Sequence, residues 1–210
     1  MQIVVCCNET LKHELLSTGL QQGAEPIWVF EKVALLPYKT ADAVIDLLFE
    51  NDAETIEILQ QFSGLKIISS VIHTLHETND SFVRINGWPT FLKAHTIEAS
   101  ALHEDLKKMT ETIFLSFNKT IEWLPDEPGF VVPRVVSMII NEAHFALADG
   151  VSTETEIDTA MKLGTAYPHG PFEWSKKIGL KNIAALLHKL SGQQSRYEPA
   201  PLLVQRAEIT

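Results

Sequence analysis

Basic side chains are scarce in this chain. It carries 17 Lys and Arg against 27 Asp and Glu in 210 residues, a formal net charge of −10 at pH 7. Nucleic-acid interfaces need clustered Lys and Arg, and anionic lipid surfaces attract basic segments. We therefore expect no nucleic-acid partner and no membrane-surface partner.

Cysteine is also rare, since the sequence holds only the adjacent pair Cys6 and Cys7, inside an apolar run. Neighbouring cysteines rarely pair with each other, so we expect free thiols and a cytoplasmic location. Whether this vicinal pair has a role stays open. No apolar run approaches the ~20 residues of a membrane span. The first ten residues lack a basic stretch, so we expect no signal peptide.

The first part of the chain alternates short β-branched apolar runs with helical periods. Such alternation is typical of βαβ units and a parallel sheet. We expect strands over residues 2–7, 27–30, 43–49, 65–68, 82–85, 90–97 and 121–123, and helices over 10–20, 54–62 and 100–118.

The character of the sequence changes at the breaker cluster over residues 125–129. From Pro133 onward the apolar period is helical, Thr153 and Glu156 have the spacing of a capping box, and Pro171 fits the first turn of another helix. We therefore predict an α/β domain over residues 1–125 and an all-helical domain over residues 126–210.

Four ordered motifs in the second half resemble those of the 3-hydroxyacyl-CoA dehydrogenase family. They are PGFVVPR (128–134) for the family's PGFIVNR, EIDTAMKLG (156–164) for EDIDTAMKLG, YPHGPFE (167–173) for YPMGPFE, and RYEPAPLL (196–203) for RYxPSPLL. In the first half, ADAVIDLLFEN (41–51) is similar to the family's ADLVVEAIFEN. The resemblance implies a truncated Rossmann-like domain, then the family's helical C-terminal domain, which dimerises and helps to bind acyl-CoA in fatty-acid metabolism.

The resemblance also implies NAD as cofactor, which needs a glycine-rich turn after the first strand. Glycines let the backbone approach the pyrophosphate at a helix N-terminus. The three glycine positions of that turn fall on Cys7, Glu9 and Lys12. Side chains there obstruct the approach, and Glu9 adds negative charge. Glu31, where a ribose-binding acid would lie, is read as a solvated residue. We expect no cofactor.

The family's catalytic pair is a histidine and a glutamate, in which the histidine takes the hydroxyl proton. Aligning its HFFNP segment on residues 86–89 puts Asn86 at the histidine. The glutamate falls on Glu98, since 98 − 86 = 12 is the family's spacing. A carboxamide has no usable proton equilibrium near pH 7. Asn86 is therefore a degenerate catalytic position that keeps its partner, Glu98.

Two substrate-binding positions are similarly altered. The asparagine of PGFIVNR is Pro133 here, which has no donor, and Ser70 is the remnant of the family's NTSS segment. His95 is a poor substitute base, because residues 95 and 98 of an extended segment point to opposite faces. His73 and His76 form half a metal site at most, so we expect no metal.

These changes together predict a degenerate family member that lacks NAD binding and dehydrogenase activity and keeps an acyl-CoA-type ligand cleft. Two alternatives stay open: an active NAD-dependent 3-hydroxyacyl-CoA dehydrogenase, and a structural or regulatory partner of a fatty-acid enzyme. We also expect a homodimer through the helical domain. The helix expected over 133–148 is apolar around most of its circumference, so it needs burial on nearly all sides.

Overall fold

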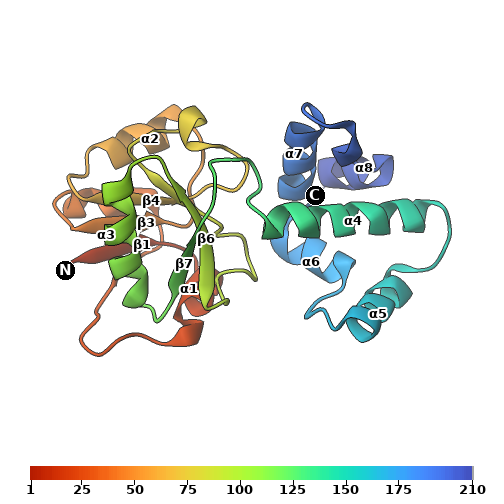
Figure 1. Cartoon of the computed structure of the whole chain (residues 1–210), viewed down its shortest axis with the longest axis horizontal. Coiled ribbons are helices and arrows are strands. Elements are labelled where there is room, and N and C mark those ends of the chain that lie inside the picture. Colours follow the sequence, from red (N-terminus) through yellow and green to blue (C-terminus); the bar gives the residue numbers. More distant parts are fainter. Residues whose placement is uncertain (210) are drawn as a thin grey trace. The chain divides into compact units, whose positions relative to one another are not determined.

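The computed structural model of the protein describes residues 1–209 and divides into two compact units (Figure 1). The first unit is Met1–Phe130, and the second begins at Val131. The boundary expected between residues 125 and 126 lies just before this division. Each unit has its own secondary structure.

The first unit is built on a seven-stranded sheet in the order β2-β1-β3-β4-β5-β6-β7. Every neighbouring pair is parallel except β5 and β6, which run antiparallel. An antiparallel pair needs no crossover helix, and residues 86–95 join these two strands directly. The strands are β1 (Ile3–Cys6), β2 (Ile27–Val29), β3 (Ala43–Asp46), β4 (Leu65–Ser69), β5 (Val83–Ile85), β6 (Thr96–Ala101) and β7 (Thr120–Trp123).

Helices α1 (Glu9–Leu15), α2 (Ala53–Gln60) and α3 (Glu104–Leu115) belong to the same unit. Side chains alternate between the two faces of each strand, so the sheet has a core on either side. One core joins Val5, Ile45 and Ile67 to apolar residues of α1 and α3, and the other joins Val4, Val44 and Ile68 to Leu59 of α2.

Several predicted bounds in this unit are wrong. The strand expected over residues 43–49 ends at Asp46, and the helix expected over residues 10–20 ends at Leu15. The largest difference lies over residues 90–103. Residues 90–95 form turns rather than a strand, and β6 runs on to Ala101, so α3 begins at Glu104 and not at residue 100. Thr90 has a φ of 81°, which a strand does not tolerate. Its N–H donates to both carboxylate oxygens of Glu14 at 2.9 and 2.8 Å. This long-range contact fixes the turn and leaves no local sequence signal.

The second unit is helical throughout and comprises α4 (Val132–Ala148), α5 (Glu154–Thr165), α6 (Pro171–Ile178), α7 (Leu180–Ser191) and α8 (Pro201–Ile209). Thr153 and Glu156 form the predicted capping box at α5, and Pro171 opens α6 as expected. Helix α4 contacts α6, α7 and α8. Within residues 1–209, no helix has the length and apolarity that crossing a bilayer requires.

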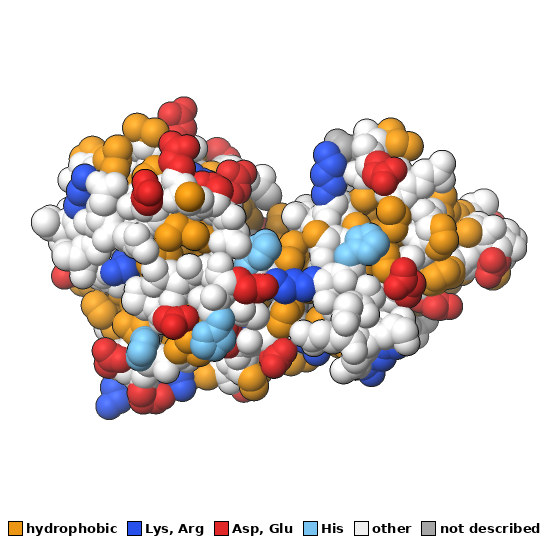
Figure 2. All heavy atoms as spheres, turned by 90° about the horizontal axis from the view of Figure 1, so that it is seen from above, with side chains coloured by type: hydrophobic (Ala, Val, Ile, Leu, Met, Phe, Trp, Pro, Cys, Tyr) orange, Lys and Arg blue, Asp and Glu red, His pale blue; other side chains and the backbone are white. Residues whose placement is uncertain are grey.

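Basic side chains do not gather on the face of the molecule shown in Figure 2, where Lys and Arg lie scattered among acidic residues. This face therefore offers no stripe of positive charge of the kind that tracks a phosphate backbone.

Candidate functional site

The first unit has a topological switch point between β1 and β3. The chain passes from β1 to β2 on one side and later returns to β3 on the other side of β1. Open α/β sheets bind ligands beyond the carboxyl ends of the strands at such a point. Cys6, Cys7 and Asp46 occupy those strand ends here.

The turn after β1 is closed by side chains. Asn8 caps α1, and its side-chain oxygen accepts the N–H of Leu11 at 2.9 Å. Cys7 is fully buried, and the Glu9 carboxylate stands in the first helical turn, 4.0 Å from the Lys12 ammonium. That Lys12 nitrogen lies about 5 Å from two ring centres, 5.4 Å from Trp28 and 5.3 Å from Phe30.

These side chains do not form the cradle that the family's cofactor uses. A pyrophosphate needs open backbone N–H groups at the helix N-terminus and close access to glycine backbone. Here the carboxamide of Asn8 takes one of the N–H groups, and the carboxylate of Glu9 already interacts with the helix dipole. The three positions that the family fills with glycine hold a buried thiol, an acid and a lysine packed on aromatic rings.

Asp46 is a completely buried acid at the end of β3. One carboxylate oxygen accepts the N–H of Leu48 at 2.9 Å, while Oδ2 has no hydrogen-bond partner among the described residues. Burial raises its pKa to about 6, although the Leu48 N–H and the charge of Lys32 act in the opposite direction. Asp46 is thus a group that changes charge slightly below neutral pH.

The vicinal cysteines are packing residues. Both are free and fully buried. Burial raises the pKa of the Cys6 thiol to about 12, with a further contribution from the charge of Asp46, and raises that of Cys7 to about 11. Because only the thiolate is a strong nucleophile, neither side chain is reactive near pH 7.

Asn86 and Glu98 lie in direct contact. The antiparallel register pairs Ile85 with Ala99, so residues 86 and 98 face each other just beyond the last pair. The Asn86 side-chain Nδ2 donates to Glu98 Oε2 at 2.9 Å, and its backbone N–H donates to the Glu98 carbonyl at 2.9 Å. Asn86 is only 3% exposed. The carboxylate is therefore held by a buried amide that does not titrate.

The other residues singled out from the sequence are dispersed. The Ser70 hydroxyl donates to the His73 carbonyl at 2.8 Å, and Pro133 lies in the first turn of α4 in the second unit. His95 is exposed just before β6. His76 contacts the Asp80 carboxylate at 3.3 Å. Among the described residues there is no cluster of three or more side chains suited to hold a metal ion.

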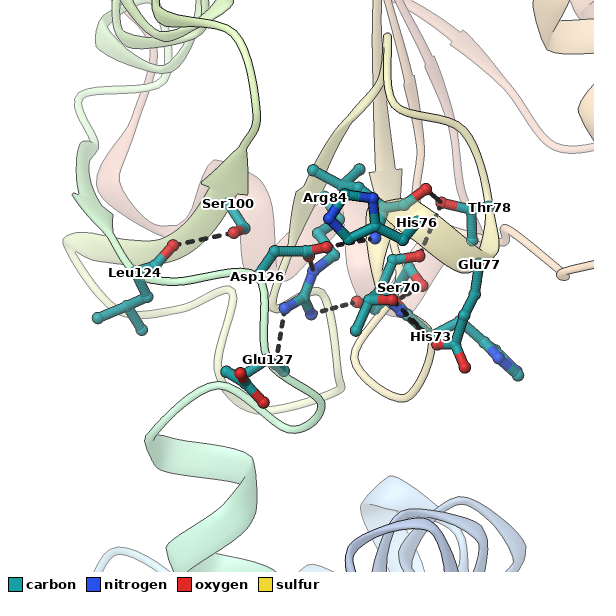
Figure 3. A network of polar contacts seen from close by, with 12 residues as sticks. Ser70, His73, His76, Glu77, Thr78, Arg84, Ser100, Leu124, Asp126 and Glu127 are labelled. Carbon is teal, nitrogen blue, oxygen red and sulfur yellow. Dashed lines mark hydrogen bonds and ion pairs between the residues drawn. The ribbon is translucent and has the colours of Figure 1, made fainter. Parts of the chain in front are cut away.

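One buried, charged side chain of the sheet was not selected from the sequence. Arg84, in β5, is 0% exposed, and its Nε donates to Asp126 Oδ1 at 2.5 Å (Figure 3). An arginine inside the apolar strand predicted over residues 82–85 was the available signal, because a buried guanidinium requires an acidic or carbonyl partner.

The family motifs of the second unit form structural contacts. Asp158 accepts the backbone N–H groups of Phe172 and Glu173 at 2.8 and 3.1 Å, and so caps α6. A Cβ on Gly170 would lie 2.3 Å from the Asp158 carboxyl group, which explains the glycine. Asn141 clamps the chain before α8 by donating to the Glu198 carbonyl and accepting the Ala200 N–H.

The fold is a Rossmann-like α/β domain followed by an all-α domain. Residues 129–210 match the family model of the 3-hydroxyacyl-CoA dehydrogenase C-terminal domain. The second unit therefore carries the C-terminal domain of the 3-hydroxyacyl-CoA dehydrogenase family, and the chain as a whole is 3-hydroxyacyl-CoA dehydrogenase-like.

Three relatives illustrate this likeness. The chain is 42% identical to 3-hydroxyadipyl-CoA dehydrogenase of Escherichia coli over 118 residues, which cover 55% of this chain and 25% of that protein. It is 30% identical to a probable 3-hydroxybutyryl-CoA dehydrogenase of Bacillus subtilis over 181 residues, 78% of this chain and 63% of that protein. The crystal structure of M. tuberculosis FadB2 shares the fold with a TM-score of 0.76 at 14% identity, covering 99% of this chain and 93% of that one.

The chain spans only part of the curated relatives that it matches, between 25% and 63% of the length of the first four. The matches support the likeness to this family and the fold, whereas the activity and the ligands of this chain are matters of proposal.

Proposed function

We propose that this 3-hydroxyacyl-CoA dehydrogenase-like protein neither uses NAD nor oxidises 3-hydroxyacyl-CoA. The observation that carries the proposal is the hydrogen bond from Asn86 to Glu98. The family places a histidine at the position of Asn86 by the alignment above, and a carboxamide cannot accept the hydroxyl proton during hydride transfer.

The closed turn after β1 supports the same proposal independently. Hydride transfer requires the nicotinamide and the hydroxyl carbon to be held together, and effective molarity can be worth ~7–11 kcal/mol. Glu9 and Lys12 stand where the family has glycine. Losing both the base and the cofactor turn should reduce the rate far more than the ~10²–10⁴ that a general base alone supplies.

We further propose that an acyl-CoA-type molecule remains the ligand. The support is the retained helical domain and the names of the relatives, which act on 3-hydroxyadipyl-CoA and 3-hydroxybutyryl-CoA. The buried free thiols support the predicted cytoplasmic location, because the reducing cytoplasm keeps cysteines unpaired.

Thermal unfolding in the presence of acyl-CoAs of increasing chain length tests this proposal. A ligand at 100 times its Kd stabilises the native state by ~2.7 kcal/mol, so a real ligand raises the melting temperature visibly. We expect a shift with at least one acyl-CoA, none with NAD, and no NADH from 3-hydroxybutyryl-CoA. NADH production by the unmodified protein would favour the active-dehydrogenase alternative. Inertness toward every acyl-CoA would favour the structural partner.

A further inference from the structure

The segment that ends the first unit is fastened to the sheet by one buried guanidinium. Arg84 Nε donates to Asp126 Oδ1 at 2.5 Å, and another guanidinium nitrogen donates to the Glu127 carbonyl at 2.6 Å. The guanidinium carbon lies 4.1 Å from the centre of the Phe130 ring. Three of the residues just before Val131 therefore contact the same side chain.

The same guanidinium also holds the loop that follows β4. Its third nitrogen donates to the Ser70 carbonyl at 3.2 Å, and Figure 3 shows Ser70, Asp126 and Glu127 arranged around Arg84. The other oxygen of Asp126 accepts the N–H of Leu75 at 2.8 Å. The carboxylate thus bridges the guanidinium and this loop.

A backbone contact completes the connection, because the Gly129 N–H donates to the Val71 carbonyl at 2.8 Å. Gly129 and Phe130 have φ values of 86° and 46°. Two successive left-handed residues are costly for the chain, above all at Phe130, and persist only where contacts over-determine them. The stacking of Phe130 on Arg84 is such a contact.

We propose that Arg84 is a positioning residue that couples the Ser70–Thr78 loop to the Asp126–Phe130 segment, so that the two open and close as one strap. Both segments depend on the same buried charge. Neither can move away from the sheet without exposing the Arg84 guanidinium to solvent or leaving the Asp126 carboxylate without its ion-pair partner. Separating the partners of a buried ion pair strongly destabilises the structure around them. Opening of one segment therefore favours opening of the other, so that the two open cooperatively. The strap joins the loop that carries Ser70 to the segment that leads into α4.

Hydrogen exchange of two backbone amides measures this coupling. The amides of Leu75 and Gly129 report on the two halves of the strap, since each donates across it. In the unmodified protein we expect both to exchange with the same opening equilibrium. Arg84→Met removes the guanidinium and leaves an unbranched, uncharged side chain. In this variant both amides should exchange faster together, by on the order of 100-fold. Amides of the central strands, such as Val5 and Ile45, should keep their protection.

Ser100→Ala is the matched control. Ser100 is the cross-strand neighbour of Arg84 in β6, but its hydroxyl donates to the Leu124 carbonyl at 2.9 Å, directly before the strap, and to none of the groups that bind the guanidinium. This variant should leave the exchange of both reporter amides unchanged.

Three results would overturn the coupling: exchange that is unaffected in Arg84→Met, acceleration of only one of the two amides, or equal acceleration in Ser100→Ala. If Arg84→Met does not fold, Asp126→Asn decides, because it keeps the shape of the side chain and removes its charge. It must accelerate Leu75 and Gly129 together, and acceleration of one alone would contradict the proposal.

Discussion

At the scale of single residues, the proposed loss of dehydrogenase activity depends on which side chain contacts Glu98. A glutamate hydrogen-bonded to a histidine can orient a base, whereas a glutamate hydrogen-bonded to Asn86 faces a group that never titrates near neutral pH. The spacing of twelve residues allowed this pair to be selected from the sequence. Its geometry follows from the antiparallel register of β5 and β6, which the sequence did not reveal.

Restoring the histidine should not restore activity. Asn86→His rebuilds a His–Glu pair with Glu98, but the turn over residues 7–12 remains closed to the cofactor. We expect no NADH above background from 3-hydroxybutyryl-CoA in this variant, measured by absorbance in a large excess of NAD. A measurable rate from this single change would show that the argument from Cys7, Glu9 and Lys12 is wrong.

Asp46 should make stability depend on pH. Burial raises its pKa from 3.8 to about 6, so the native state favours the protonated form. That contribution is fully present below about pH 4 and is lost as the pH rises through about 6. At 1.36 kcal/mol per pKa unit, the loss is about 3 kcal/mol. The side-chain amide of the Asp46→Asn variant does not ionise, so the variant should not lose this stability as the pH rises.

Urea unfolding of both proteins at several pH values tests this. The free energy of unfolding of Asp46→Asn relative to the unmodified protein should rise by up to about 3 kcal/mol between about pH 4 and pH 7.5. A difference that stays constant across this range would contradict a buried, ionising Asp46.

At the scale of elements, strands with a strong apolar pattern could be predicted closely, as β1 and β4 show. The structure of residues 90–101 could not be predicted, because the backbone conformation of Thr90 depends on a hydrogen bond to Glu14, which is far away in sequence. Arg84 escaped attention for a similar reason: its partner Asp126 lies 42 residues away. Capping signals at α5 and α6 are local, and those predictions are confirmed.

The motif around α6 should be intolerant of one added methyl group. A Cβ at position 170 would meet the Asp158 carboxyl at 2.3 Å, and that carboxylate caps α6. We expect Gly170→Ala to lower the free energy of unfolding by about 1–3 kcal/mol, the usual cost of overpacking.

Gly164→Ala is its natural control. Gly164 lies within α5, and a Cβ there would meet nothing within 4 Å. Alanine is the better helix former, so this variant should be stabilised by about 0.5–1 kcal/mol. Chemical denaturation of both variants checks the pair, and equal effects of the two substitutions would refute the packing account.

At the scale of the whole molecule, the helical unit leaves an apolar surface uncovered. Val131, Val132 and Val135 are 54%, 40% and 52% exposed. On α4, Val135 also lines a groove of about 530 Å³ together with Met138, Ile139, Glu142, Arg134, Arg196 and Tyr197. Exposed apolar side chains of this kind are typical of an interface, and we propose that a second copy of the chain covers them.

Light scattering at micromolar concentration should therefore give a mass near 47 kDa, twice 23.5 kDa. Val135→Glu places a charge in the groove and should yield monomers. Val151→Glu, at a 73% exposed position outside α4, should leave the dimer intact. A mass of 23.5 kDa for the unmodified protein would exclude the dimer.

The proposed loss of NAD binding depends on the closed turn after β1, and calorimetric titration with NAD tests that turn most directly. With Asn8 capping α1 and with Glu9 and Lys12 at the glycine positions, we expect no heat of binding at physiological NAD concentrations. A dissociation constant in the micromolar range would contradict the account.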